Sequence, residues 1–253
     1  MNPSIFSLEG KTAVITGGGT GLGRAMAEAF VRAGARVLIT GRREEPLMET
    51  AEYLGTACTH FVHDVTVRDA ATILLNNAEL VMGKTDILVN NAGIGFKRSI
   101  AETSEEDLIR VLNTHLLGVF SLSKHFAEAM KSHGGGSILL ISSLTAFLAV
   151  QSAAAYSIAK SGLSGLMRSI VAEYASGGIR CNSIMPGWID TPMLRKVFEG
   201  DDARKQKALN RIPVRKLGTP EDVAAAAVFL ASDAAAYIHG ACLPVDGGAL
   251  YNL

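Results

Sequence analysis

Seven short apolar runs alternate with longer amphipathic segments along the chain. The runs are continuous in hydrophobic residues rather than alternating, which is typical of strands that are buried on both faces of a parallel sheet. The segments between them have helical periodicity, so we expect them to cover those two faces. The expected strands are residues 13–16, 36–40, 58–62, 86–89, 137–141, 179–184 and 241–245, and the expected helices are residues 22–33, 67–82, 105–130, 153–176 and 220–230.

This alternation predicts an α/β fold, namely a Rossmann-like, doubly wound parallel sheet of about seven strands with helices on both faces. Right-handed crossovers place the loops that follow the strands along one edge of such a sheet, where ligands bind. The chain has no linker or repeat, so we expect a single domain over residues 1–253. Residues 189–212 are irregular and charged, and we expect either a substrate loop or a solvated pair of helices there.

Composition narrows the class of protein further. The 253 residues are 48% hydrophobic and 19% charged with a net charge of zero, and Arg42-Arg43 is the longest basic run, so no nucleic-acid partner is expected. No apolar stretch is long enough to cross a bilayer, and residues 1–11 lack the features of a signal peptide. Cys58, Cys181 and Cys242 lie far apart without metal-ligand spacing, which predicts reduced thiols, no metal site and a cytoplasmic location.

A glycine-rich run joins the first expected strand to the first expected helix. Glycines allow positive φ and let backbone N–H groups approach a pyrophosphate, whose charge the helix N-terminus favours. The spacing is GxxxGxG rather than the more general GxGxxG, but the strand–loop–helix context indicates a dinucleotide site rather than an ordinary turn. The candidate residues in this run are Gly17, Thr20, Gly21, Leu22 and Gly23.

The end of the second expected strand bears on the choice of cofactor. Sites that prefer NAD place Asp or Glu there to bind the ribose 2′-hydroxyl. This chain has Thr40-Gly41-Arg42-Arg43 instead. Two guanidinium groups, and no carboxylate to repel a 2′-phosphate, favour NADP(H), while NAD(H) stays open.

Tyr156 and Lys160 lie four residues apart and therefore on one helical face. Such a pair is uninformative by itself, but this one opens the helix after the strand at 137–141, whose loop carries Ser142 and Ser143. A free tyrosine has a pKa near 10. We expect the ammonium of Lys160 to stabilise the phenolate and lower that pKa, so that the pair can transfer a proton.

Taken in order, these motifs resemble the short-chain dehydrogenase/reductase family. The set comprises the glycine loop, Asn90-Asn91-Ala92-Gly93 after the fourth strand, a serine ahead of YxxxK, and Pro186-Gly187 after the sixth strand. The resemblance covers nearly the whole chain, from Lys11 to Gly248, and is strongest to members that act as 3-oxoacyl-thioester reductases. It implies an NAD(P)-dependent oxidoreductase that interconverts a ketone and a secondary alcohol.

The resemblance also implies residue roles. Tyr156 would be the general acid/base, Lys160 would lower its pKa and hold the nicotinamide ribose, and Ser143 would polarise the substrate. Asn113 would hold a water in the proton relay, although it could instead be a helix-kink or capping residue. Asp64 and Val65 would touch the adenine and Thr191 the nicotinamide carboxamide, and the other expected cofactor contacts are Asn91, Ala92, Gly93, Pro186, Gly187 and Ile189.

The segments expected around the substrate are mostly apolar. An apolar pocket with few polar anchors suits a hydrophobic or medium-sized ketone better than a small polyol. A 3-oxoacyl-thioester or general ketone reductase is therefore the first interpretation, with a sugar or polyol dehydrogenase second, a dienoyl-thioester reductase third and a catalytically silent cofactor sensor as the alternative outside enzymes. The expected substrate residues are Phe96, Ser143, Leu144, Gln151, Trp188 and Met193.

The long segments 105–130 and 153–176 carry more small and apolar residues than one sheet face needs. Members of the family pack these two helices against those of a partner, so the resemblance implies a homotetramer or a homodimer. The apolar tail, residues 250–253, would reach a second interface.

Overall fold

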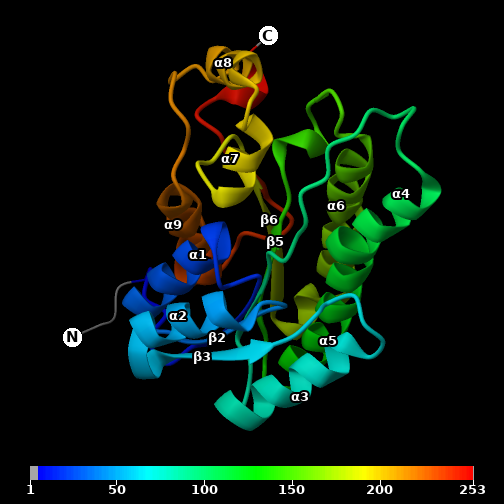
Figure 1. The fold of residues 1–253 in the computed structure, drawn as a ribbon. Helices are drawn as coiled ribbons and strands as arrows, with labels where there is room; N and C mark the ends of the chain where they lie inside the picture. The colour runs from blue at the N-terminus through cyan, green and yellow to red at the C-terminus, as the bar shows by residue number, and fades with distance from the viewer. Residues whose placement is uncertain (1–4, 253) are drawn as a thin grey trace.

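The computed structural model describes residues 5–252 and contains a seven-stranded sheet with the strand order β3-β2-β1-β4-β5-β6-β7 (Figure 1). Every neighbouring pair of strands is parallel, so the expected doubly wound sheet is confirmed. Residues 1–4 and 253 lie outside the described part, and with them parts of the expectations for segments 1–11 and 250–253. The strands are β1 (Thr12–Thr16), β2 (Arg36–Gly41), β3 (Cys58–Val62), β4 (Ile87–Asn90), β5 (Gly136–Ile141), β6 (Ile179–Pro186) and β7 (Cys242–Val245).

Two helical layers cover the sheet because alternate strand residues point to opposite faces. Ala13 and Ile15 pack against α1 (Gly21–Arg32), α2 (Glu44–Leu54) and α9 (Pro220–Ala231). Val14 packs on the other face against α3 (Ala70–Met82), α5 (Gly118–Ser132) and α6 (Ala154–Tyr174). Phe30 of α1 and Phe126 of α5 are fully buried, one in each layer.

The segment at 105–130 was expected to be one helix, but the structure divides it. A helix α4 (Glu105–Leu112) begins at the N-cap Ser104 and is followed by a π turn (Asn113–Leu117) before α5 starts at Gly118. At Gly118 a Cβ would come within 2.8 Å of the Val65 carbonyl oxygen, so the chain passes very close to the segment after β3 here. Within the π turn, Thr114 and His115 are the buried side chains.

The insertion at 189–212 contains two short helices, α7 (Pro192–Phe198) and α8 (Asp202–Arg211). Thr191 caps α7 by accepting a hydrogen bond from the Leu194 N–H, and Asp201 caps α8 in the same way. Both helices lie near the upper end of the sheet in Figure 1, above α9. The expected pair of helices is therefore present, and the expectation of a substrate loop stays a prediction.

No helix within residues 5–252 is long and apolar enough to span a membrane. The three cysteines are unpaired, with Cys58 and Cys181 buried, as expected.

Candidate active site

A cavity of about 460 Å³ lies at the carboxyl ends of the strands and crosses the point where the strand order reverses, between β1 and β4. This is the position at which open α/β sheets bind ligands. Its walls come from the segments that follow β1, β2, β3, β4, β5 and β6, together with α7 and one residue of α8. Segments far apart in the sequence therefore meet in one chamber.

The glycine loop leaves the N-terminus of α1 open to this cavity. Gly17 and Gly21 adopt positive φ values of 69° and 54°, and Thr20 caps α1 without a side-chain hydrogen bond. Asn91 fixes the loop, because its amide donates to the carbonyl oxygens of Thr16 at 2.9 Å and of Gly17 at 3.2 Å. These two bonds satisfy the carbonyl oxygens of Thr16 and Gly17, and the N–H groups in the first turn of α1, which have no partner within a helix, suit a pyrophosphate.

One expected cofactor residue of this loop does not line the cavity. A Cβ at Gly23 would collide with the Gly17 carbonyl oxygen and lie 2.7 Å from Nδ2 of Asn91. Gly23 therefore allows α1 to pack closely against the loop, and the structure places it behind the cofactor surface. The sequence therefore requires glycine at position 23, but for the packing of α1 against the loop rather than for contact with the cavity.

The end of the cavity next to β2 and β3 contains several polar side chains. The guanidinium groups of Arg42 and Arg43 are exposed there and form no hydrogen bond or ion pair with residues 5–252, and the buried Nε2 of His63 has no partner in that range. Asp64 accepts hydrogen bonds from Thr66; burial opposes ionisation of its carboxyl, but these bonds and the charge of Arg42 together lower its pKa. This donor set fits a nucleotide, with cations placed for a phosphate.

Tyr156 and Lys160 line the cavity, together with Ser143. Tyr156 is in the first turn of α6, and the Nζ atom of Lys160 lies 5.5 Å from the centroid of its ring. Lys160 is only 4% exposed, and its Nζ donates to the carbonyl oxygen of Ile141 at 2.6 Å. Ser143 follows β5, and its Oγ accepts a hydrogen bond from the Thr145 N–H.

The electrostatics differ in one respect from the sequence expectation. Burial raises the pKa of Tyr156 to about 12, and the neighbouring Ser143 hydroxyl only partly offsets that rise. Burial also lowers the pKa of Lys160 to about 7. The expected lowering of the tyrosine pKa by the lysine is therefore not observed in this structure, because desolvation dominates both groups.

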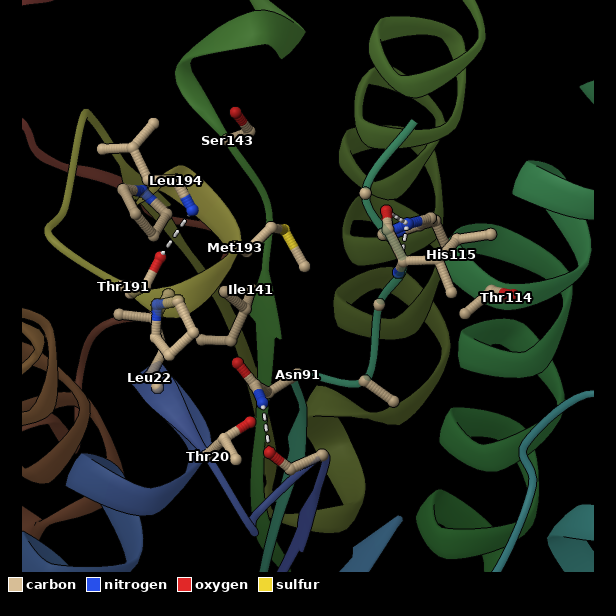
Figure 2. Close-up of a pocket in the computed structure, with 18 of the residues that line it drawn as sticks. Thr20, Leu22, Asn91, Thr114, His115, Ile141, Ser143, Thr191, Met193 and Leu194 are labelled. Carbon is tan, nitrogen blue, oxygen red and sulfur yellow. Dashed lines mark hydrogen bonds between the residues drawn. The ribbon is translucent and has the colours of Figure 1, made fainter. Parts of the chain in front are cut away.

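Another part of the cavity lies between α7 and the segment after β4. Figure 2 shows Met193 and Leu194 on one side and His115 on the other. Of the expected substrate residues, Phe96, Ser143, Trp188 and Met193 line this cavity. The expected cofactor residues also line it, apart from Gly23: Gly17, Thr20, Gly21, Leu22, Arg42, Arg43, Asp64, Val65, Asn91, Ala92, Gly93, Tyr156, Lys160, Pro186, Gly187, Ile189 and Thr191.

Three further expected site residues, besides Gly23, lie outside the cavity. Leu144 is 3% exposed and packs in a small core cluster with Ile212 and Ala249. Gln151 is exposed and belongs to a neighbouring shallow hollow. Asn113 opens the π turn and does not line the cavity, whereas Thr114 and His115 do.

Sequence reasoning also missed residues that the fold brings into the wall. His63 follows β3, His115 comes from the π turn, and Arg204 reaches the cavity from α8. His63 could have been found beside Asp64, because both follow the same strand. No helical period and no motif in the sequence identifies His115 or Arg204 as a residue of the cavity wall.

Comparison with known proteins agrees with this geometry. A family model described as enoyl-(acyl carrier protein) reductase matches residues 17–250. The chain is 37% identical to 3-oxoacyl-(acyl-carrier-protein) reductase of Salmonella typhimurium over 243 residues, which are 96% of this chain and 98% of the relative. It is also 37% identical to 2-dehydro-3-deoxy-D-gluconate 5-dehydrogenase of Bacillus subtilis over 250 residues, 96% of each chain.

Solved structures give the same assignment. A putative short-chain alcohol dehydrogenase from Sinorhizobium meliloti superimposes with a TM-score of 0.95 at 36% identity, covering 99% of this chain and 100% of the other. A putative NAD(P)-dependent gluconate 5-dehydrogenase from Beutenbergia cavernae, with bound NADP, gives 0.93 at 38% identity, covering 98% and 99%. The chain belongs to the short-chain dehydrogenase/reductase family and is an oxidoreductase that acts on alcohol and keto groups with a nicotinamide cofactor.

Proposed function

We propose that the enzyme uses NADP(H) to interconvert a ketone and a secondary alcohol, with Tyr156 as the general acid/base. The observation that carries this proposal is the placement of Tyr156, Lys160 and Ser143 in the wall of the cavity that also contains the glycine loop. When bound, the nicotinamide supplies the hydride in reduction and accepts it in oxidation. The protein then has to bind the carbonyl oxygen and exchange one proton with it.

Ser143 and Tyr156 are suited to that oxygen. Ser143 Oγ accepts the Thr145 N–H at 3.2 Å, and its own O–H, which is within hydrogen-bonding reach of the Tyr156 hydroxyl, can donate to a substrate oxygen placed between them. With a pKa of about 12, the Tyr156 phenol is protonated at neutral pH and is a proton donor in ketone reduction. Oxidation needs the phenolate, which forms more readily at alkaline pH.

The cofactor preference rests on the end of β2. Arg42 and Arg43 line the cavity there, while the adjacent Glu44 and Glu45 do not. Guanidinium groups bind a 2′-phosphate, and no carboxylate lies where it would bind a free 2′-hydroxyl. Bound NADP in two solved relatives supports this preference, and a 7α-hydroxysteroid dehydrogenase with NADH keeps NAD(H) as the alternative.

The mechanism is tested by replacing Tyr156 with Phe. We expect this substitution to abolish ketone reduction while NADPH still binds, because it removes only the proton donor. Tyr237→Phe is the matched control, since the Tyr237 side chain is fully exposed and far from the lining. Near-wild-type turnover by the Tyr156 variant would show that another group transfers the proton.

The apolar wall formed by Phe96, Trp188 and Met193 supports a hydrophobic or medium-sized ketone as the first substrate class. Similarity to a 3-oxoacyl-(acyl-carrier-protein) reductase agrees with that choice. We therefore keep 3-oxoacyl-thioester and general ketone reduction as the first candidate.

One observation favours a second candidate, a hydroxy acid of the sugar-acid type. Arg204 lines the cavity, and its guanidinium forms no hydrogen bond or ion pair with residues 5–252. By contrast, Arg195 in the same insertion is paired with Asp190. An unpaired guanidinium in a cavity wall suits a carboxylate, and relatives named as gluconate dehydrogenases supply such a substrate class.

The two candidates differ in their response to Arg204→Ala. For a hydroxy acid, we expect kcat/KM to fall by about 10- to 100-fold, the cost of losing a hydrogen-bonded charge, while the methyl ester of the same acid is unaffected. Lys207→Ala is the control, because Lys207 is exposed and outside the lining. Equal losses for acid and ester would remove the case for a carboxylate site.

We also propose a homotetramer in the cytoplasm. Ile109 of α4, Phe120 of α5 and Ile158 of α6 are each more than half exposed, which supports the expected pairing of these helices with a partner. The unpaired cysteines suit a reducing compartment. Light scattering that showed a monomer at working concentrations would contradict the assembly.

A further inference from the structure

His115 is a buried histidine for which the reaction as described has no use. It lies in the π turn between α4 and α5, is only 2% exposed, and still contributes to the cavity wall. Its imidazole stands edge-on to the phenol ring of Tyr156, with ring centroids 5.0 Å apart and planes at 81°. The T-shaped arrangement is a favourable one for aromatic rings and fixes the relative orientation of the two side chains.

The same imidazole also holds the segment that follows β4. Its Nε2 atom lies 3.0 Å from the N atom of Ile94 and 2.9 Å from the carbonyl oxygen of the same residue (Figure 2). A Cβ at Gly93 would come within 2.6 Å of the imidazole Cε1, and Gly93 does not have a positive φ. Glycine is therefore required at 93 by the close approach of the His115 ring rather than by backbone conformation.

The second ring nitrogen indicates that this imidazole does more than fill space in the core. Nδ1 of His115 is buried and has no hydrogen-bond partner within residues 5–252. An unsatisfied buried polar atom destabilises the folded state, and a Leu of similar volume would avoid that cost. The polar ring therefore lowers the stability of the folded protein. A Leu at this position could not reproduce its contacts with Ile94 and Tyr156.

We propose that His115 is a positioning residue that couples the segment after β4 to the phenol of Tyr156. Through Ile94 and Gly93 it fixes one wall of the cavity, and through its edge contact it sets the direction of the tyrosine hydroxyl. This inference rests on the proposed role of Tyr156. It assigns His115 no proton transfer and no contact with the reacting atoms.

A double-mutant cycle between Gly93 and His115 tests the coupling. Gly93→Ala places a methyl group against the imidazole, so we expect the ring to be displaced and kcat to fall by about 100-fold, as for small misplacements in an active site. His115→Ala should lower kcat by about 10-fold through loss of the edge contact. If the contact is the cause, the double variant has a higher kcat than Gly93→Ala alone, and a double variant no faster than Gly93→Ala overturns the proposal.

A second measurement separates positioning from a general structural role. The dissociation constant for NADPH, measured by fluorescence, should stay within about 2-fold in His115→Ala, while kcat falls. His125→Ala is the matched control, because His125 of α5 is half-buried outside the cavity and, among residues 5–252, its ring bonds only the Ser121 carbonyl oxygen. Unchanged kcat in His115→Ala, or equal losses of kcat and NADPH affinity, would overturn the proposal.

His115→Phe keeps the test valid if the alanine variant is unstable. Phe preserves the edge contact and the packing on Gly93 but cannot bond Ile94, so we expect kcat to recover to within about 3-fold of wild type. Failure of Phe to improve on Ala would contradict the role of the ring contact. Activity retained by Tyr156→Phe would instead overturn the proposed function itself, so the two failures are distinguishable.

Discussion

The Nζ atom of Lys160 donates a hydrogen bond to the carbonyl oxygen of Ile141, the last residue of β5, at 2.6 Å. This bond ties the first turns of α6 to the sheet edge and holds the ammonium group under the phenol of Tyr156. It also explains how a lysine can be 4% exposed, since a buried ammonium requires hydrogen-bond acceptors. Lys160 thus connects α6 to the end of β5 and also places its amino group beside Tyr156.

Replacing Lys160 with Met should therefore reduce turnover strongly. Met has a similar length but cannot donate to Ile141 or carry charge beside Tyr156, so we expect kcat to fall by about 100-fold or more. Steady-state kinetics at saturating NADPH measures this. Lys124→Met is the control, because Lys124 is exposed on α5, and a Lys160 variant as active as that control would contradict the role of the ammonium.

The pH dependence of oxidation tests the high pKa of Tyr156. With a pKa of about 12, the phenolate fraction rises about tenfold per pH unit throughout the neutral range. We expect kcat/KM for alcohol oxidation to rise up to about pH 10 without a plateau, while that for ketone reduction stays constant. A plateau in oxidation near neutral pH would instead indicate that the charge of Lys160 lowers the tyrosine pKa, as the sequence suggests.

The cofactor preference is tested by Arg42→Ala. The loss of a charge-assisted hydrogen bond to the 2′-phosphate should lower kcat/KM for NADPH by about 10- to 100-fold and leave that for NADH within about 2-fold. Arg32→Ala removes the same charge from an exposed position at the end of α1 and is the control. An unchanged NADPH-to-NADH ratio in the Arg42 variant would exclude a 2′-phosphate contact.

Asn91 should act on cofactor binding rather than on chemistry. Its amide fixes the carbonyl oxygens of Thr16 and Gly17, so Asn91→Ala frees the glycine loop. We expect the dissociation constant for NADPH to rise by about 10-fold, while kcat at saturating cofactor changes little. Asn210→Ala, at an exposed position of α8, provides the comparison. A fall in kcat with unchanged NADPH binding would contradict this role.

The sequence predicts those parts of the molecule that local chemistry controls. The parallel sheet follows from continuous apolar runs, and the glycine loop and the pair of Tyr156 and Lys160 follow from fixed spacings next to strands. Each of these features lies within one element or at one of its ends. The strand boundaries accordingly agree with the structure to within one or two residues.

The residues that were misplaced depend on contacts between distant segments. Asn113 lies outside the cavity and His115 in its wall because the π turn breaks the helical period. This turn ends directly before Gly118, where the chain meets the Val65 carbonyl oxygen. Leu144 points into the core because a short helical turn after Ser143 rotates it away from the cavity. Arg204 enters the wall only through the packing of α8. Helical and strand periods contain no information on such contacts.

His115 provides a last prediction, on stability in acid. Burial and the nearby charge of Lys160 lower its pKa from 6.5 to about 3, so the folded protein keeps the imidazole neutral where the unfolded chain protonates it. Because the unfolded state then binds more protons, this residue lowers the free energy of unfolding as pH falls from 6.5 towards about 3. Between about pH 7 and pH 5 the contribution amounts to about 2 kcal/mol.

Urea denaturation of wild type and His115→Phe at these two pH values measures that contribution. The variant lacks the titrating group, so its stability should fall less than that of wild type by about 2 kcal/mol, whatever the carboxylates contribute to both proteins. His125→Phe makes the same replacement on α5, outside the cavity, and is the control for removing an imidazole elsewhere in the protein. Equal acid sensitivity of wild type and the His115 variant would mean that the imidazole is not held neutral beside Tyr156 and Lys160.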